Sequence, residues 1–122
     1  MVDALGNPVA FVLSPGQTHD SVKAHELIEH VENGSCLLAD TPYDNQTTHL
    51  HLKNKKGFTV IRPRRNRIAP YSYDKHQYKE RHLIECFFNK IKHFRRIFSR
   101  FDKSIQSFLG FVYFVGTLVW LR

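Results

Sequence analysis

The segment CLLADTPYD, Cys36–Asp44, decides how the chain folds. Its first four residues are apolar, and a turn-forming sequence follows them directly. This pattern predicts a short buried strand over Cys36–Ala39. Asp40 then lies at the carboxyl end of the strand. An Asp at such a position is either an ordinary turn residue or a carboxylate displayed at the edge of a sheet.

The sequence on the carboxyl side of this segment continues an alternation of helix and strand. Asp44 is predicted to cap a short polar helix that ends near Gly57. A second apolar run, FTVI, predicts a buried strand over Phe58–Ile61. A strand, a helix and a strand in succession indicate an α/β fold with parallel pairing. A proline-containing basic loop follows, and then two predicted helices, over His76–Ser99 and Lys103–Leu121.

The charge of the chain is divided unequally along its length. The 122 residues carry a formal net charge of +7 and suffice for one modest domain. Up to Leu52, one basic residue, Lys23, stands against seven acids, whereas from Lys53 on 17 basic residues stand against four acids. A strongly basic rear half predicts a polyanionic partner, most often nucleic acid. The alternative is a solvated basic face without a partner.

Two further features bear on the class of protein. Cys36 and Cys86 are the only cysteines, and their apolar neighbours predict buried thiols in a reducing compartment. Neither cysteine has metal-binding spacing, and the eight His residues form no ligand set. The uncharged run Ile105–Leu121 is 17 residues long, just short of a membrane span. A buried core helix is therefore favoured over a membrane anchor.

The segment YKERHLIECFFNKIK runs from Tyr78 to Lys92, and from Arg81 onward Glu85 is its single acid. On a helical wheel Tyr78, Arg81, Glu85 and Lys92 share one face, opposite an apolar stripe that contains Phe87. This face is either an ordinary solvated surface with an Arg–Glu pair or a functional one. In the second reading the basic residues hold a phosphate backbone, and Glu85 joins Asp40 in holding divalent metal ions.

The spacing of these four residues is also that of a known signature. Tyr78-x2-Arg81-x3-Glu85-x6-Lys92 resembles the Y-R-E-K signature of DDE transposases from bacterial insertion sequences. ADTPYD, Ala39–Asp44, is similar to the segment that carries the second catalytic Asp of that family. VDALGNPVAFVLSPGQTHDS, VIRPRRNR and the apolar tail extend the resemblance over nearly the whole chain.

The resemblance implies a ribonuclease H-like fold and a nuclease and strand-transfer activity that depends on Mg²⁺ or Mn²⁺. By position, Asp40 and Glu85 would be the second and third catalytic residues and metal ligands. Tyr78, Arg81 and Lys92 would contact DNA phosphates near the cut. The other DNA-binding residues expected from the basic segments are Arg62, Arg64, Arg65, Arg67, Lys90, Arg95 and Arg96.

The chain departs from the family pattern at two places. Thr41 and Pro42 follow Asp40, where the family has a basic and then a small residue. The first catalytic Asp of the family lies on a strand upstream of VDALGNP, so Asp3 does not fit that role. We therefore expect residues 1–122 to be the C-terminal part of a transposase catalytic domain: a partial ribonuclease H-like fold with a mixed sheet and helices that lacks its first strand. A metal ion is expected only when the full acidic triad is present.

These expectations extend to partners and location. The expected partners are double-stranded DNA at transposon ends, the N-terminal half of the transposase and a second copy of the chain, without a membrane. The expected location is the bacterial cytoplasm, at the nucleoid. Two alternatives remain open at this level: a non-catalytic DNA-binding remnant, and a small membrane protein anchored by Ile105–Leu121.

Overall fold

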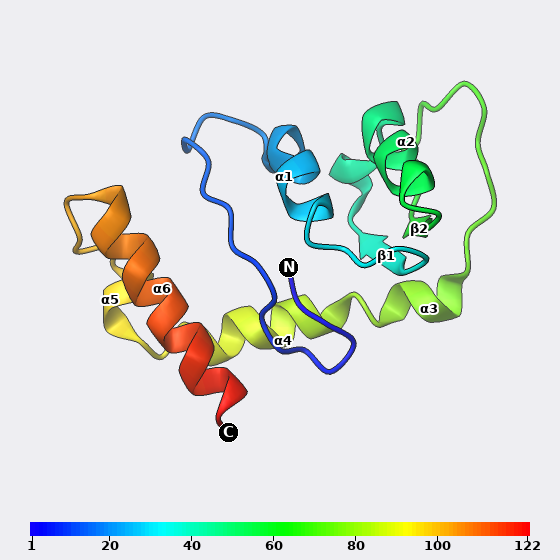
Figure 1. The fold of residues 1–122 in the computed structure, drawn as a ribbon. Helices are drawn as coiled ribbons and strands as arrows, with labels where there is room; N and C mark the ends of the chain where they lie inside the picture. The colour runs from blue at the N-terminus through cyan, green and yellow to red at the C-terminus, as the bar shows by residue number, and fades with distance from the viewer. The chain divides into compact units, whose positions relative to one another are not determined.

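The computed structural model describes all 122 residues, which divide into two compact units. One unit is Ser14–Arg81, and the other combines Met1–Leu13 with His82–Arg122 (Figure 1). The chain contains a two-stranded parallel sheet together with several helices. The expectation of a mixed α/β class is confirmed at this level.

The sheet of the Ser14–Arg81 unit joins the two predicted strands. Strand β1 is Cys36–Ala39 and strand β2 is Phe58–Ile61, as their apolar runs predict. They pair in parallel, with Cys36 opposite Phe58 and in register to the last residue of each strand. Helix α2, Gln46–Asn54, makes the crossover that two parallel strands require.

Parallel pairing brings the carboxyl ends of both strands to the same edge of the sheet. Asp40 follows β1 there, and the basic loop, Arg62–Asp74, follows β2. The basic loop has no helix or strand of its own. The other elements of this unit are η1 (Asp20–Lys23), α1 (Ala24–Ile28), η2 (Thr41–Tyr43) and α3 (Lys75–Lys79).

Helix α2 begins one residue later than the sequence indicates. Asn45 is its N-cap, and the Asn45 side chain accepts a hydrogen bond from the backbone N–H of Thr48 at 2.8 Å. The prediction that Asp44 caps this helix is therefore wrong. The carboxylate of Asp44 is 0% exposed and is engaged by donors from other parts of the unit.

The second unit is built on a small aromatic and aliphatic core. Phe87, Ile91 and Val115 are buried together, and partly buried apolar side chains such as Phe11 pack around them. The indole Nε1 of Trp120 donates to the Pro8 carbonyl oxygen at 2.6 Å, which fastens the N-terminal segment to the last helix. The helices of this unit are α4 (His82–Ile91), α5 (Arg95–Phe98) and α6 (Ile105–Trp120).

The single helix predicted over His76–Ser99 is wrong, because the chain forms α3, α4 and α5 in its place. The break after α3 has a local cause. The N–H of Glu80 bonds the carbonyl of Gln77 at 3.0 Å, and that of Arg81 bonds the carbonyl of Tyr78 at 3.2 Å. These bonds to the third preceding residue tighten the chain and end the α-helical pattern.

Two other predictions can be compared with the structure. Helix α6 matches the predicted last helix, and no helix of the chain has both the length and the apolar character needed to cross a membrane. The prediction of buried thiols is wrong, because Cys36 and Cys86 are both exposed. Cys36 opens its strand at an exposed end, and Cys86 precedes the buried Phe87 on a helix that buries one side only.

Gly57 tests the packing between α2 and β2. A Cβ atom on Gly57 would lie 2.5 Å from the carbonyl oxygen of Ser35 and 3.0 Å from Leu52 Cγ. We expect Gly57→Ala to lower the free energy of unfolding by about 1–3 kcal/mol, measured by urea denaturation, because backbone atoms must shift. Gly16→Ala is the control, since a Cβ there meets nothing within 4 Å. Equal stability of the two variants would contradict the described packing.

Candidate carboxylate site and nucleic-acid interface

The structure brings three of the predicted site residues together at the carboxyl end of β1. The Nε of Arg81 lies 3.0 Å from Asp40 Oδ1, and the Asp40 side chain is 48% exposed. The guanidinium of Arg81 also lies over the ring of Tyr78, 5.7 Å from its centroid. Asp40, Arg81 and Tyr78 therefore form one cluster within the Ser14–Arg81 unit.

Glu85 and Lys92 belong to the other unit. Glu85 is exposed in the first turn of α4, and Lys92 is exposed just beyond the end of that helix. The Nζ of Lys92 donates to Asn89 Oδ1 at 3.2 Å. Because α3 and α4 are separate helices, Tyr78 and Glu85 do not share a helix, and the single-helix geometry predicted for the signature is wrong.

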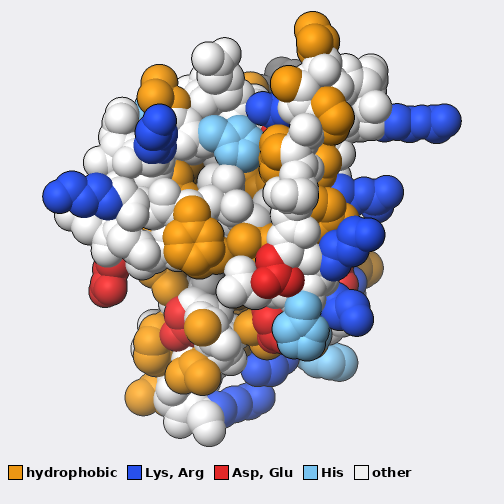
Figure 2. Space-filling model, turned by 90° about the vertical axis from the view of Figure 1, so that its right-hand side faces the viewer, with side chains coloured by type: hydrophobic (Ala, Val, Ile, Leu, Met, Phe, Trp, Pro, Cys, Tyr) orange, Lys and Arg blue, Asp and Glu red, His pale blue; other side chains and the backbone are white.

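The remaining predicted DNA-binding residues divide into free and engaged side chains. Arg62 and Arg65 of the basic loop are exposed, and Lys90 is exposed on α4. Arg96, by contrast, pairs with Asp102 through its Nε at 3.0 Å. The guanidinium of Arg95 lies 5.5 Å from the ring centroid of Phe101. Figure 2 shows Lys and Arg side chains projecting from the surface at several points on the face in view.

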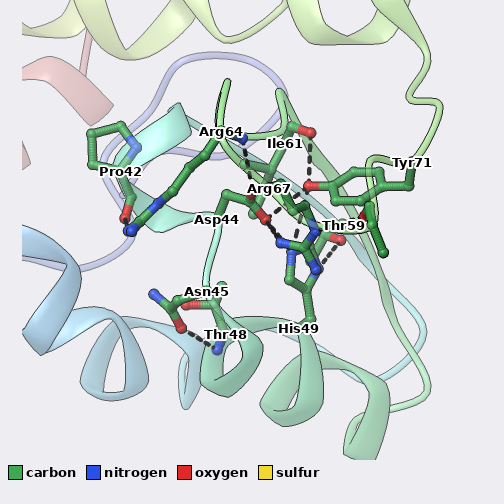
Figure 3. A network of polar contacts seen from close by, with 11 residues as sticks. Pro42, Asp44, Asn45, Thr48, His49, Thr59, Ile61, Arg64, Arg67 and Tyr71 are labelled. Atoms are coloured by element: carbon green, nitrogen blue, oxygen red, sulfur yellow. Dashed lines mark hydrogen bonds and ion pairs between the residues drawn. The ribbon is translucent and has the colours of Figure 1, made fainter.

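Asp44 is the centre of a polar network that joins the basic loop to α2 (Figure 3). Its Oδ2 accepts from the backbone N–H of Arg64 at 2.8 Å, and its Oδ1 accepts from His49 Nε2 at 2.9 Å. Arg67 Nη1 forms an ion pair with Oδ1, and the hydroxyl of Tyr71 lies 3.1 Å from the same oxygen. Asp44 is thus a buried carboxylate whose hydrogen-bonding capacity is filled.

The network shifts the acidities of two of its members. Burial alone would raise the pKa of Asp44, but hydrogen bonds from His49, the backbone of Arg64, Arg67 and Tyr71 together lower it from 3.8 to about 2. Burial and the neighbouring Asp44 charge raise the pKa of Tyr71 to about 12. At neutral pH Asp44 is therefore ionised and Tyr71 keeps its proton.

His49 is held through both ring nitrogens. Its Nε2 donates to Asp44, since an ionised carboxylate can only accept, and its Nδ1 lies 2.8 Å from Thr59 Oγ1. These contacts join α2 to β2 beside the basic loop. The sequence reading missed Asp44, His49 and Tyr71 as a set. Its only signal was an Asp before a helix, which is as typical of a cap as of a buried carboxylate.

The two predicted metal ligands, Asp40 and Glu85, are both carboxylates. Carboxylate oxygens suit Mg²⁺, and both Asp40 and Glu85 are accessible to solvent. No group of three or more His, Cys, Asp or Glu side chains that could hold a metal ion is formed. Each of the two residues supplies oxygen donors of the kind that Mg²⁺ takes.

Comparison with known proteins shows the family. Residues 1–115 match the family described as transposase DDE domain, and the chain belongs to this family. It is also similar to a Brucella ovis protein named as a transposase for insertion sequence element IS6501. The two are 36% identical over 123 residues, which cover all of this chain and 95% of the relative. No solved structure matches the chain.

The low pKa of Asp44 predicts a loss of stability in acid. Because its folded value of about 2 lies below its ordinary 3.8, the contribution is fully present above about pH 4 and is lost as the pH falls towards 2. The shift corresponds to about 2 kcal/mol. We expect urea denaturation between pH 5 and pH 2 to show this loss in the wild-type chain. Asp44→Asn should be less stable at pH 7 and show a smaller loss in acid; an unchanged pH dependence would contradict the assignment.

Proposed function

We propose that residues 1–122 are the C-terminal part of the catalytic domain of an insertion-sequence transposase, with a ribonuclease H-like arrangement of β1 and β2. The family match over residues 1–115 is the observation that carries the proposal. The parallel pairing supports it, because it brings Asp40 and the basic loop to one edge of the sheet. In this proposal the chain acts in DNA transposition together with the part of the domain that supplies the first acid.

Asp40 and Glu85 are the proposed catalytic carboxylates and ligands of Mg²⁺ or Mn²⁺. A bound ion would activate a water molecule and stabilise the leaving oxygen in phosphoryl transfer. In this proposal the family's first catalytic Asp would supply the third carboxylate. Arg81 holds the Asp40 side chain through its Nε, and its guanidinium lies over the Tyr78 ring.

The proposed role of the basic residues is to hold the DNA backbone. In this proposal Tyr78, Arg81 and Lys92 of the signature contact DNA phosphates near the cut. Arg62, Arg65 and Lys90 are exposed cations, which makes them available to phosphate oxygens. The proposed partner is duplex DNA at transposon ends, and assembly with a second copy or with the upstream part of the domain forms the working complex. Arg95 and Arg96 are further proposed contacts, whereas the side chains of Arg64 and Arg67 bind groups of the protein itself.

A second candidate function is DNA binding without cleavage. It is favoured by the ion pair between Asp40 and Arg81, which gives the carboxylate a partner in the absence of metal. The same basic residues serve both functions. Metal-dependent cleavage distinguishes them, since only the transposase function requires Asp40 and Glu85.

The charge distribution predicts the character of DNA binding. Seven basic residues and no acid lie between Lys53 and Arg67, so binding to duplex DNA should release counterions. We expect weak binding with little sequence preference and an affinity that falls steeply between 50 and 200 mM salt. Fluorescence anisotropy with a labelled duplex measures this directly. An affinity that stayed constant over this range would rule out phosphate contacts as the main interaction.

The catalytic role of Glu85 is tested in a chain extended upstream by the strand that carries the family's first Asp. Glu85→Ala should abolish Mg²⁺-dependent cleavage of transposon-end DNA and leave DNA binding unchanged or slightly tighter, because one negative charge is removed. Asp40→Ala should behave in the same way. Gel electrophoresis of the DNA measures cleavage.

Glu80→Ala is the matched control for this experiment. Glu80 is exposed at the end of α3, five positions before Glu85, and it is not part of the signature. We expect this variant to keep most of the cleavage activity. If Glu80→Ala and Glu85→Ala cleaved DNA to a similar extent, the assignment of Glu85 as a catalytic residue would be wrong. Glu85 would then be a surface residue whose loss costs less than about 1 kcal/mol of stability.

A further inference from the structure

Several polar contacts that hold the basic loop to the rest of its unit converge on Asp44. Three groups of the loop reach the carboxylate: the backbone N–H of Arg64, the guanidinium of Arg67 and the hydroxyl of Tyr71. The Asp44 side chain is 0% exposed, so these contacts are shielded from water. Figure 3 shows Arg67, Tyr71 and His49 around Asp44, and the side chain of Arg64 running toward Pro42.

The same loop residues also reach the ends of both strands. The Nη2 of Arg64 donates to the carbonyl oxygen of Pro42 at 3.0 Å, in the turn just after Asp40. The hydroxyl of Tyr71 lies 3.1 Å from the carbonyl oxygen of Ile61, the last residue of β2. The network therefore spans the edge of the sheet from the turn after β1 to the loop after β2.

The four arginines of the loop are not equivalent in this arrangement. The side chain of Arg67 is 31% exposed, pairs with Asp44, donates through Nε to the Ala69 carbonyl oxygen at 3.1 Å and lies 4.9 Å from the ring centroid of Tyr71. Arg62 and Arg65 are exposed and form no hydrogen bond or ion pair within the protein. A guanidinium that is paired with a buried carboxylate has few N–H donors left for a phosphate. An exposed guanidinium without a partner has all of its donors available.

We propose that Asp44 is a positioning residue, which fixes the basic loop beside Asp40 with Arg67 as its anchor, so that Arg62 and Arg65 are the contacts that this loop makes to DNA phosphate. This inference rests on the proposed function for its ligand, the duplex DNA. It assigns Arg67 to the protein's own structure, and it gives Asp44 a role beside the proposed carboxylates that is distinct from metal binding.

The first test compares two equivalent substitutions in the same loop, Arg65→Gln and Arg67→Gln, by fluorescence anisotropy with a labelled duplex between 50 and 200 mM salt. Arg65→Gln should reduce the slope of log affinity against log salt by about 0.9, the value for one phosphate contact, and leave the melting temperature unchanged. Arg67→Gln should leave the slope unchanged and lower the melting temperature. A slope reduced by about 0.9 in Arg67→Gln, with an unchanged melting temperature, would overturn the proposal.

The second test uses limited proteolysis, in the absence of DNA, to measure how firmly the basic loop is held. Trypsin cleaves after Arg64 and Arg65 in every variant, whereas Pro63 blocks cleavage after Arg62, so the rate of cutting at these two sites reports how firmly the loop is held. Asp44→Asn and Arg67→Gln should both accelerate cutting in the loop severalfold. The double variant should be cut no faster than Asp44→Asn alone, because Asp44→Asn already removes the Asp44–Arg67 ion pair. Arg67→Lys, which keeps a charge, should restore part of the protection.

Gly57→Ala is the control for general destabilisation, because it disturbs the packing of α2 and β2 and leaves the Asp44 contacts in place. If Gly57→Ala and Asp44→Asn lower the melting temperature equally, trypsin should cut the loop of Gly57→Ala more slowly than that of Asp44→Asn. If trypsin cut the loop of both variants at the same rate, Asp44 would stabilise the unit in general, and the proposal that it positions the loop would be refuted. The two proposals fail separately: a wild-type affinity that does not depend on salt counts against DNA binding, while the cutting experiment tests the loop alone.

Discussion

The burial of one carboxylate organises the unit that carries the proposed ligand Asp40. An ionised group can be removed from water only if hydrogen bonds and an opposite charge replace its hydration. For Asp44 the replacements come from α2 and from the basic loop, so both must be in place for the carboxylate to be satisfied. Because Asp44 needs its hydrogen bonds from the basic loop, the loop has a defined course although it contains no helix or strand.

The same constraint explains how a strongly basic segment can lie against a small protein core. Seven basic residues without an acid between Lys53 and Arg67 would repel one another if all were packed inward. Asp44 neutralises Arg67 where the loop meets the core, and Arg64 binds the backbone of the turn after β1. Lys55 binds the carbonyl oxygens of Glu29 and Val31, and Arg62 and Arg65 are exposed. The chain thereby keeps exposed cations next to Asp40, as the proposed contact with a nucleic-acid backbone requires.

The unit that carries Glu85 depends on apolar packing. Phe87 and Ile91 of α4 meet Val115 of α6, and no charge interrupts α6 from Ile105 to Trp120. The basic side chains of this unit lie outside the core, among them Lys90 and Lys92 at the end of α4. The two proposed carboxylates therefore occupy different kinds of position. Asp40 lies at the end of a strand beside a polar network, and Glu85 lies on the exposed face of a helix that packs on its other side.

The sequence by itself determined the two strands, the crossover helix, the apolar stripe of α4 and the family, because apolar runs, turn residues and the spacing of Tyr78, Arg81, Glu85 and Lys92 are local patterns. Only the tertiary structure decided that Asp44 is buried, that both cysteines are exposed and that the predicted long helix is divided. Burial of Asp44 depends on Arg67 and Tyr71, which lie 23 and 27 positions away. Neither a cap-like Asp nor a basic loop reveals separately that the two will be joined.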